Sequence, residues 1–203
     1  MDDFRTRLNV SRETSERLSA FVDLLTKWNS KINLVSKSSM EQVWIRHVWD
    51  SVQIYGLAPK GGLWTDLGSG GGFPGIVVAI LALQASPDQR FVLVESDQRK
   101  ATFLRVAIRE LGLNATVDAS RIESLPPANS DILSARALAD LSTLLAFSDR
   151  HLSLGGIAIF PKGENWTKEV AAARAEWSFD LETHTSVTDP SAAILLVKGI
   201  NRV

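Results

Sequence analysis

A cluster of glycines most constrains what this chain can fold into. Five of the eight residues from Gly68 to Gly75 are glycine, and they follow the apolar stretch Leu63–Leu67. Ordering glycine costs more chain entropy than ordering any other residue, so we expect this backbone to approach another group closely. The stretch Gly75–Leu83 predicts a helix, whose N-terminus offers free N–H groups and the positive end of the helix dipole. The segment therefore predicts a strand, a ligand-binding turn and a helix.

Short apolar runs alternate with helical patterns from residue 63 onward. After the first strand and helix, strands are predicted at Phe91–Glu95, Ala115–Asp118, Asp131–Ala135 and Ile157–Phe160. Helices are predicted at Gln98–Leu111, ending at Gly112, at Leu141–Leu152, with Gly155-Gly156 as its stop signal, and at Trp166–Trp177. Two strands near Leu181–Val187 and Ala193–Lys198 predict a closing hairpin. The alternation indicates an α/β fold, a mostly parallel sheet with helices on both faces.

The residues before this region have a different pattern. Apolar side chains recur at spacings of three and four in two stretches, which predicts two amphipathic helices: Leu18, Phe21, Val22, Leu25 and Trp28 in the first, and Met40, Val43, Trp44, His47 and Val48 in the second. The segment Ala58–Gly62 then breaks helix. We interpret residues 1–58 as an N-terminal helical cap and residues 59–203 as one compact unit.

Composition excludes several kinds of site. The chain has no cysteine, which removes disulfides, iron–sulfur clusters and thiolate nucleophiles, and its three histidines show no metal-binding spacing, so we expect no metal. The longest apolar run, Ile76–Leu83, is far shorter than the roughly 20 residues that cross a bilayer, and the acidic start resembles no secretory signal. We therefore expect a cytoplasmic protein without a membrane segment. With 22 basic against 23 acidic residues, any nucleic-acid contact requires a local basic face.

Two classes of cofactor compete for the glycine turn. Gly70, Gly72 and Gly75 satisfy the dinucleotide pattern G-x-G-x-x-G, and Glu95 lies 20 residues further on, where that pattern has its ribose-binding acid. However, Asp66 stands two residues before Gly68, where a carboxylate repels a pyrophosphate but suits a ligand with an amine and a sulfonium. We favour the second class, with Asp66 holding the amine and Glu95 holding the ribose.

The chain resembles a known family in several segments that occur in the same order. These are Lys27–Leu34, Arg46–Ser51, Asp66–Gly75, Ser120–Glu123, Ser134–Leu138 and Pro161–Gly163. The family is RsmG, bacterial small-subunit ribosomal RNA methyltransferases formerly called glucose-inhibited division protein B. The resemblance implies a class I (Rossmann-like) methyltransferase fold, S-adenosyl-L-methionine as donor, and methyl transfer to N7 of one guanine in 16S rRNA. The expected partner is 16S rRNA or the small ribosomal subunit.

The resemblance also implies roles for individual residues. Cofactor contacts carried over from the family are Gly68, Phe73, Ile122, Glu123 and Arg136, beside Asp66, Gly70 and Glu95 of the turn argument. Basic residues expected to bind RNA are Arg99, Arg121 and Lys162. Arg136 and Lys162 are expected to position the reactants. Where family members often have a basic residue before the last strand, this chain has Ser191-Ala192-Ala193, so the tail is left out of the predicted site.

No general base is expected, because guanine N7 has an in-plane lone pair and carries no proton. His47 is interpreted as a packed, hydrogen-bonded side chain of the second helix. Three alternatives stay open: a class I methyltransferase that acts on another RNA or a small molecule, a dinucleotide-dependent oxidoreductase, and a noncatalytic ribosome-binding module.

Overall fold

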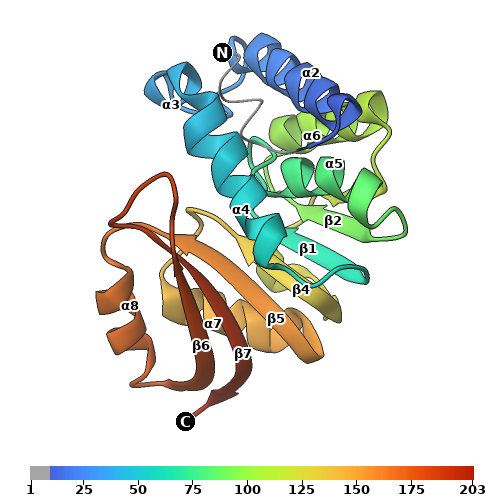
Figure 1. The fold of residues 1–203 in the computed structure, drawn as a ribbon. Helices are drawn as coiled ribbons and strands as arrows, with labels where there is room; N and C mark the ends of the chain where they lie inside the picture. Colours follow the sequence, from blue (N-terminus) through green and yellow to red (C-terminus); the bar gives the residue numbers. More distant parts are fainter. Residues whose placement is uncertain (1–9) are drawn as a thin grey trace.

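The structure, a computed structural model, describes residues 10–203 and contains one seven-stranded sheet. The strand order is β3-β2-β1-β4-β5-β7-β6 (Figure 1). The first five strands in this order are parallel, and β7 pairs antiparallel with both β5 and β6. The strands are β1 (Leu63–Leu67), β2 (Arg90–Val94), β3 (Ala115–Asp118), β4 (Ser130–Ala135), β5 (Leu152–Lys162), β6 (Trp177–Thr185) and β7 (Ala193–Arg202).

Helices cover both faces of this sheet. They are α2 (Arg12–Asn29), α3 (Lys37–Glu41), the π-helix η1 (Trp44–Trp49), α4 (Asp50–Leu57), α5 (Gly75–Ala85), α6 (Gln98–Leu111), the 3-10 turn η2 (Ile122–Ser124), α7 (Leu141–His151) and α8 (Trp166–Ala173). On one face, α2, α4, α5 and α6 share a core with β-strand residues such as Trp64 and Leu93. On the other, α7 and α8 pack on Leu67 and Phe160. The predicted fold class is confirmed.

The N-terminal helices are part of the main core. Phe21 of α2 lies against Phe73 of the glycine turn, with ring centres 5.3 Å apart, and against Phe103 of α6, at 6.4 Å. Both Phe21 and Phe103 are fully buried. Packing of this apolar face, rather than helix propensity alone, holds a helix such as α2 in place.

Several predicted elements differ in their bounds from the structure, and three differences change the type or number of elements. The second N-terminal helix is divided into α3, η1 and α4, and no side chain caps the N-terminus of the π-helix. Gly155 and Gly156 lie inside β5 and do not stop α7, because the backbone is already extended at Leu152. The helix from Trp166 ends at Ala173, and Trp177 instead begins β6 by pairing with Arg202. In each case pairing or packing with distant residues overrides the local pattern.

Two kinds of feature are absent from the described part of the chain. No helix there is long and apolar enough to cross a membrane. No group of three or more metal-ligating side chains gathers among those residues.

Candidate active site

The strand order brings almost all the predicted site residues to one edge of the sheet. The strands β3, β2, β1, β4 and β5 run parallel, so their carboxyl ends meet there. In the order of the strands, the residues at or just after those ends are Ile122 and Glu123, Glu95, the turn with Gly68, Gly70 and Phe73, Arg136, and Lys162. In sheets of this kind, ligands bind at this edge.

The glycine turn is packed on one side and open on another. Gly68 and Gly70 have φ of +66° and +53°, a backbone conformation that L side chains rarely adopt. A Cβ at Gly68 would lie 2.7 Å from a methyl group of Leu138, whereas one at Gly70 would meet nothing nearer than a backbone oxygen at 3.7 Å. The turn therefore leaves open space beside the backbone of Gly70.

Asp66 lies beneath the turn and is fully buried. Its Oδ2 accepts a hydrogen bond from the Gly75 amide at 3.1 Å, and its Oδ1 accepts one from the Ser134 hydroxyl at 2.7 Å. Burial raises the pKa of this carboxyl to about 6, although the hydrogen bonds from Ser134, Ser69 and Gly75 oppose that shift. This differs from the expected contact with a cofactor amine, because the carboxylate has no exposed surface. Asp66 instead fixes the start of α5 relative to β1.

Glu95 faces the turn from the end of β2. Its carboxylate accepts hydrogen bonds from the amides of Gly70, at 2.9 Å, and Asp97, at 2.8 Å. On the next strand along the sheet, η2 follows β3 with Ile122 buried and Glu123 exposed. This arrangement places a carboxylate beside an open glycine turn, with an apolar and an acidic side chain one strand away. Such a lining is chemically suitable for a nucleoside.

Arg136 joins the N-terminal helices to the edge of the sheet. Its guanidinium donates to the backbone oxygen of Arg46 at 2.9 Å and to Nδ1 of His47, and it forms an ion pair with Asp50 at 3.8 Å. It also lies 5.4 Å from the centre of the Phe73 ring, within the range of a cation–π contact. Only 17% of the side chain is exposed.

His47 is held between Arg136 and the glycine turn. Its ring is stacked on that of Phe73, with centres 4.8 Å apart. Burial, together with the charges of Arg136 and Arg46, lowers the pKa of His47 to about 3. The ring is therefore neutral at physiological pH, and its Nδ1 accepts the hydrogen bond from Arg136. The interpretation of His47 as a packed, hydrogen-bonded side chain is confirmed.

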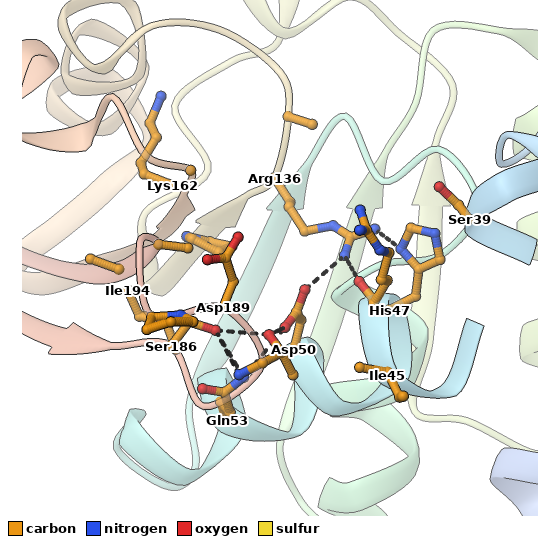
Figure 2. Close-up of a pocket in the computed structure, with 18 of the residues that line it drawn as sticks. Ser39, Ile45, His47, Asp50, Gln53, Arg136, Lys162, Ser186, Asp189 and Ile194 are labelled. Carbon is orange, nitrogen blue, oxygen red and sulfur yellow. Dashed lines mark hydrogen bonds and ion pairs between the residues drawn. The ribbon is translucent and has the colours of Figure 1, made fainter. Parts of the chain in front are cut away.

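A cavity of about 810 Å³ opens beside Arg136 (Figure 2). Its walls come from η1 and α4, the segments that follow β4 and β5, and the loop between β6 and β7. Residues that line it include Ile45, Asp50, Gln53, Arg136, Lys162 and Asp189. The volume lies in the range of small-molecule and nucleotide sites.

The loop of residues 186–192 was missed by the sequence analysis, which left the tail out of the site. Lys162 at the end of β5 pairs with Ala193 at the start of β7, so the antiparallel hairpin returns this loop to the active edge. Two residues of α4 hold it: Gln53 accepts from the Val187 amide at 2.8 Å, and Asp50 Oδ1 accepts from the Thr188 hydroxyl. The predicted hairpin was the one signal for this position, because the loop carries no recognisable motif.

The basic residues expected to bind RNA differ in their surroundings. Lys162 donates to the Ala139 carbonyl and to Glu169, each at 2.7 Å, and its side chain is only 9% exposed. It lines the cavity, but its charge is already paired, unlike that of a lysine free to meet a phosphate. Arg99 and Arg121 are exposed, and Arg99 has a weak ion pair with Asp97 at 3.5 Å.

Known proteins resemble this chain in fold and in sequence. Among solved structures, M. jannaschii TYW2 in complex with AdoMet has a TM-score of 0.58 at 14% identity, over 86% of this chain and 80% of that one. The B. subtilis M1A22 tRNA methyltransferase TrmK has a TM-score of 0.53 at 13% identity, over 73% and 64%. These likenesses show the fold, which is that of class I methyltransferases.

Likeness in sequence goes further. "Ribosomal RNA small subunit methyltransferase G" of Ruegeria sp. (strain TM1040) is 58% identical over 196 residues, which are 97% of this chain and 96% of that protein. The protein of the same name from Ruegeria pomeroyi is 56% identical over the same shares. The family model described as GidB, rRNA small subunit methyltransferase G, matches residues 14–195. The chain therefore belongs to the rRNA small subunit methyltransferase G family.

Proposed function

We propose that this protein transfers a methyl group from S-adenosyl-L-methionine to N7 of one guanine in 16S ribosomal RNA. Membership of the family supports the reaction, and the open glycine turn beside the cavity at Arg136 is the observation that carries it. The turn offers a place for a nucleoside cofactor, and the cavity offers a place for a nucleotide at the same edge of the sheet.

The residues at the turn fit S-adenosyl-L-methionine. A Cβ at Gly70 would enter open space, and the Glu95 carboxylate faces this place with acceptors for a ribose diol. We assign cofactor binding to Gly68, Gly70, Glu95, Ile122, Glu123 and Arg136, with Phe73 supporting the turn from below and Asp66 fixing its ends. The bound cofactor supplies a methyl group on a positively charged sulfur, which a lone pair attacks directly.

The protein's own residues then need to position the base, not to remove a proton. Alignment of reactants can contribute as much as roughly 7–11 kcal/mol to lowering a barrier. Arg136 is fixed by Arg46, His47 and Asp50, so it is a rigid group where cofactor and base meet. His47 is neutral, and its Nδ1 is occupied by Arg136, so it is no candidate for a base. Lys162, paired with Glu169, helps to shape the cavity wall.

The surroundings of the site extend this proposal. We assign RNA phosphate contacts to Arg99 and Arg121, which are exposed near the same edge. We assign a capping role to the segment of residues 1–58, of which residues 1–9 lie outside the described part; its η1 and α4 form one wall of the substrate cavity. We assign the enzyme to the cytoplasm, in keeping with a ribosomal RNA substrate.

Mass spectrometry of 16S rRNA tests the proposed reaction. RNA from cells that lack the gene should carry one fewer N7-methylguanine, and the purified protein with S-adenosyl-L-methionine should restore it. Calorimetric titration should show binding of S-adenosyl-L-methionine and none of NAD. An unchanged 16S rRNA, or tight binding of NAD alone, would contradict the proposal and favour the oxidoreductase alternative.

A further inference from the structure

The cavity beside Arg136 has one feature that positioning alone does not explain. Ile45, a large apolar side chain, lines it with 45% of its surface exposed. Such a surface suits the flat face of a base. Enzymes that modify a base commonly take it out of the helix into a pocket and read its Watson–Crick edge by hydrogen bonds.

Three carboxylates line this cavity, and they differ in what already occupies them. Glu169 Oε2 accepts from Lys162 and from the Leu141 amide. Asp189 is exposed, and its Oδ1 accepts from the amide and the hydroxyl of Ser191. Glu169 is thus paired with a cation at 2.7 Å, and Asp189 is open to solvent.

Asp50 differs from both, because it is partly buried and has no cation of the described residues within hydrogen-bond distance. Its Oδ1 accepts from Thr188 and, at 3.4 Å, from Gln53. Within residues 10–203, the cation nearest to Oδ2 is Arg136 at 3.8 Å, beyond hydrogen-bond distance. The side chain is 26% exposed. Burial raises the pKa of Asp50, so its carboxylate is short of the solvation that N–H donors would supply.

We infer that Asp50 is the residue that identifies the base as guanine, by accepting hydrogen bonds from its N1–H and N2–H₂ groups. This rests on the proposed function and names the substrate contact of the same site. A carboxylate accepts and does not donate. Guanine offers two donors on its Watson–Crick edge, while N7 lies on the opposite side of the base and stays free to react. Adenine has an acceptor at N1 and no amino group at C2, so it would leave the carboxylate unpaired.

The test compares guanine with inosine, which retains N1–H and N7 but lacks the amino group at C2. The substrates are 16S rRNA molecules assembled by ligation with guanosine or inosine at the target position. The quantity compared is the single-turnover rate constant divided by the RNA concentration, at RNA concentrations below saturation. Hydrogen bonds to charged groups are worth about 10- to 100-fold. The wild-type protein should therefore prefer guanine by at least about tenfold, and Asp50→Asn should reduce the preference to within about twofold.

Two matched variants separate recognition from support of the fold. Asp189→Asn removes another carboxylate from the same cavity wall, and Thr188→Val removes the hydroxyl bonded to Asp50 but keeps the carboxylate. Whatever they do to the rate, both should keep the wild-type preference, because a change in cofactor binding or loop position affects both RNAs equally. If Asp50→Asn turns over too slowly, the ratio of the two RNA affinities with S-adenosylhomocysteine bound gives the same comparison.

An unchanged preference in Asp50→Asn would overturn the inference, and so would a wild-type protein that methylates both RNAs equally well. In either case methylation of guanine itself by the wild-type protein would leave the proposed function standing. Failure of the wild-type protein to methylate guanine would instead refute the proposed function.

Discussion

The neutral ring of His47 lies face to face with Phe73, at 4.8 Å between ring centres, and so connects the π-helix to the glycine turn. The same ring accepts a hydrogen bond from Arg136. One side chain thereby fixes the cavity wall, the turn and the arginine relative to one another. This relationship gives the first two predictions.

The methyl-transfer step should be nearly independent of pH. Guanine N7 carries no proton, and His47 has a pKa of about 3, so no group in this cluster must lose a proton between roughly pH 6.5 and 8.5. Replacement of His47, His151 or His184 by Gln should leave the single-turnover rate within about tenfold, equivalent to roughly 1.4 kcal/mol. Saturating cofactor and RNA are used throughout. A steep rise with pH that one substitution abolishes would show that a proton is removed.

Stability at acid pH should depend on His47. The folded pKa is lowered to about 3 from 6.5, so the unfolded chain takes up a proton first, and stability falls as the pH decreases below about 6.5. Between pH 7.5 and 5 the wild-type protein should lose about 1–2 kcal/mol more than His47→Gln. Asp66 acts in the opposite sense, because its raised pKa favours the folded state below about pH 6, but it is common to both proteins. Urea unfolding at the two pH values measures the difference, and equal losses would contradict the prediction.

Substitution at Gly70 should separate cofactor binding from folding. A Cβ there enters the open space of the turn, so Gly70→Ala should weaken S-adenosyl-L-methionine binding by more than about tenfold, while the positive φ costs only about 1–2 kcal/mol of stability. Gly68→Val should also abolish binding, but with a greater loss of stability, because its side chain collides with Leu138. Gly56→Ala, in open space on α4, is the control. Calorimetric titration and thermal unfolding give the two quantities, and normal affinity in Gly70→Ala would refute the assignment.

The exposed arginines and the buried lysine should respond differently to salt. Arg99→Gln and Arg121→Gln should each reduce the slope of log affinity against log salt by about 0.7–0.9, the contribution of one phosphate contact. Lys162→Gln should leave that slope unchanged, because Glu169 already pairs the ammonium, and should instead lower stability. Arg202→Gln, at the opposite end of β7 from the active edge, is the control for loss of a charge. RNA titrations at several salt concentrations provide the test.

Much of the fold was predictable because the strands of a buried parallel sheet are short apolar runs. Leu63–Leu67 and Ala115–Asp118 were predicted with the bounds that the structure has, and α6 ends at Leu111 followed by Gly112, whose φ of +65° suits a helix cap. The position of the site followed from the topology, since residues after successive parallel strands meet at one edge. The π-helix was not predictable, because the same spacing of apolar residues fits an α-helix and does not show the wider turns in which His47 and Val48 are buried.

The sequence predicted where charged side chains lie better than it predicted their burial and their partners. Asp66 and Lys162 lie at the expected edge, but Asp66 is buried under the turn and Lys162 is paired with Glu169 of the next helix. A sequence shows that a charge is present but not whether a distant residue neutralises it. Asp50 was missed because its surroundings depend on a residue far away in the sequence. Its hydrogen-bond donors Gln53 and Thr188 are 3 and 138 positions away, and no local pattern predicts the contact with Thr188.

The strand order also determines when the enzyme becomes complete during its own synthesis. Among residues 10–203, the strand β6 pairs with β7 alone in the sheet, and β7 is made after all the other strands. A growing chain can assemble β1 to β5 and hold the glycine turn, yet β6 has no partner until Ala193–Arg202 leaves the exit tunnel. The loop that closes the cavity against Asp50 and Gln53 is fixed only then. Cofactor binding can therefore precede completion of the sheet, whereas capture of the base cannot.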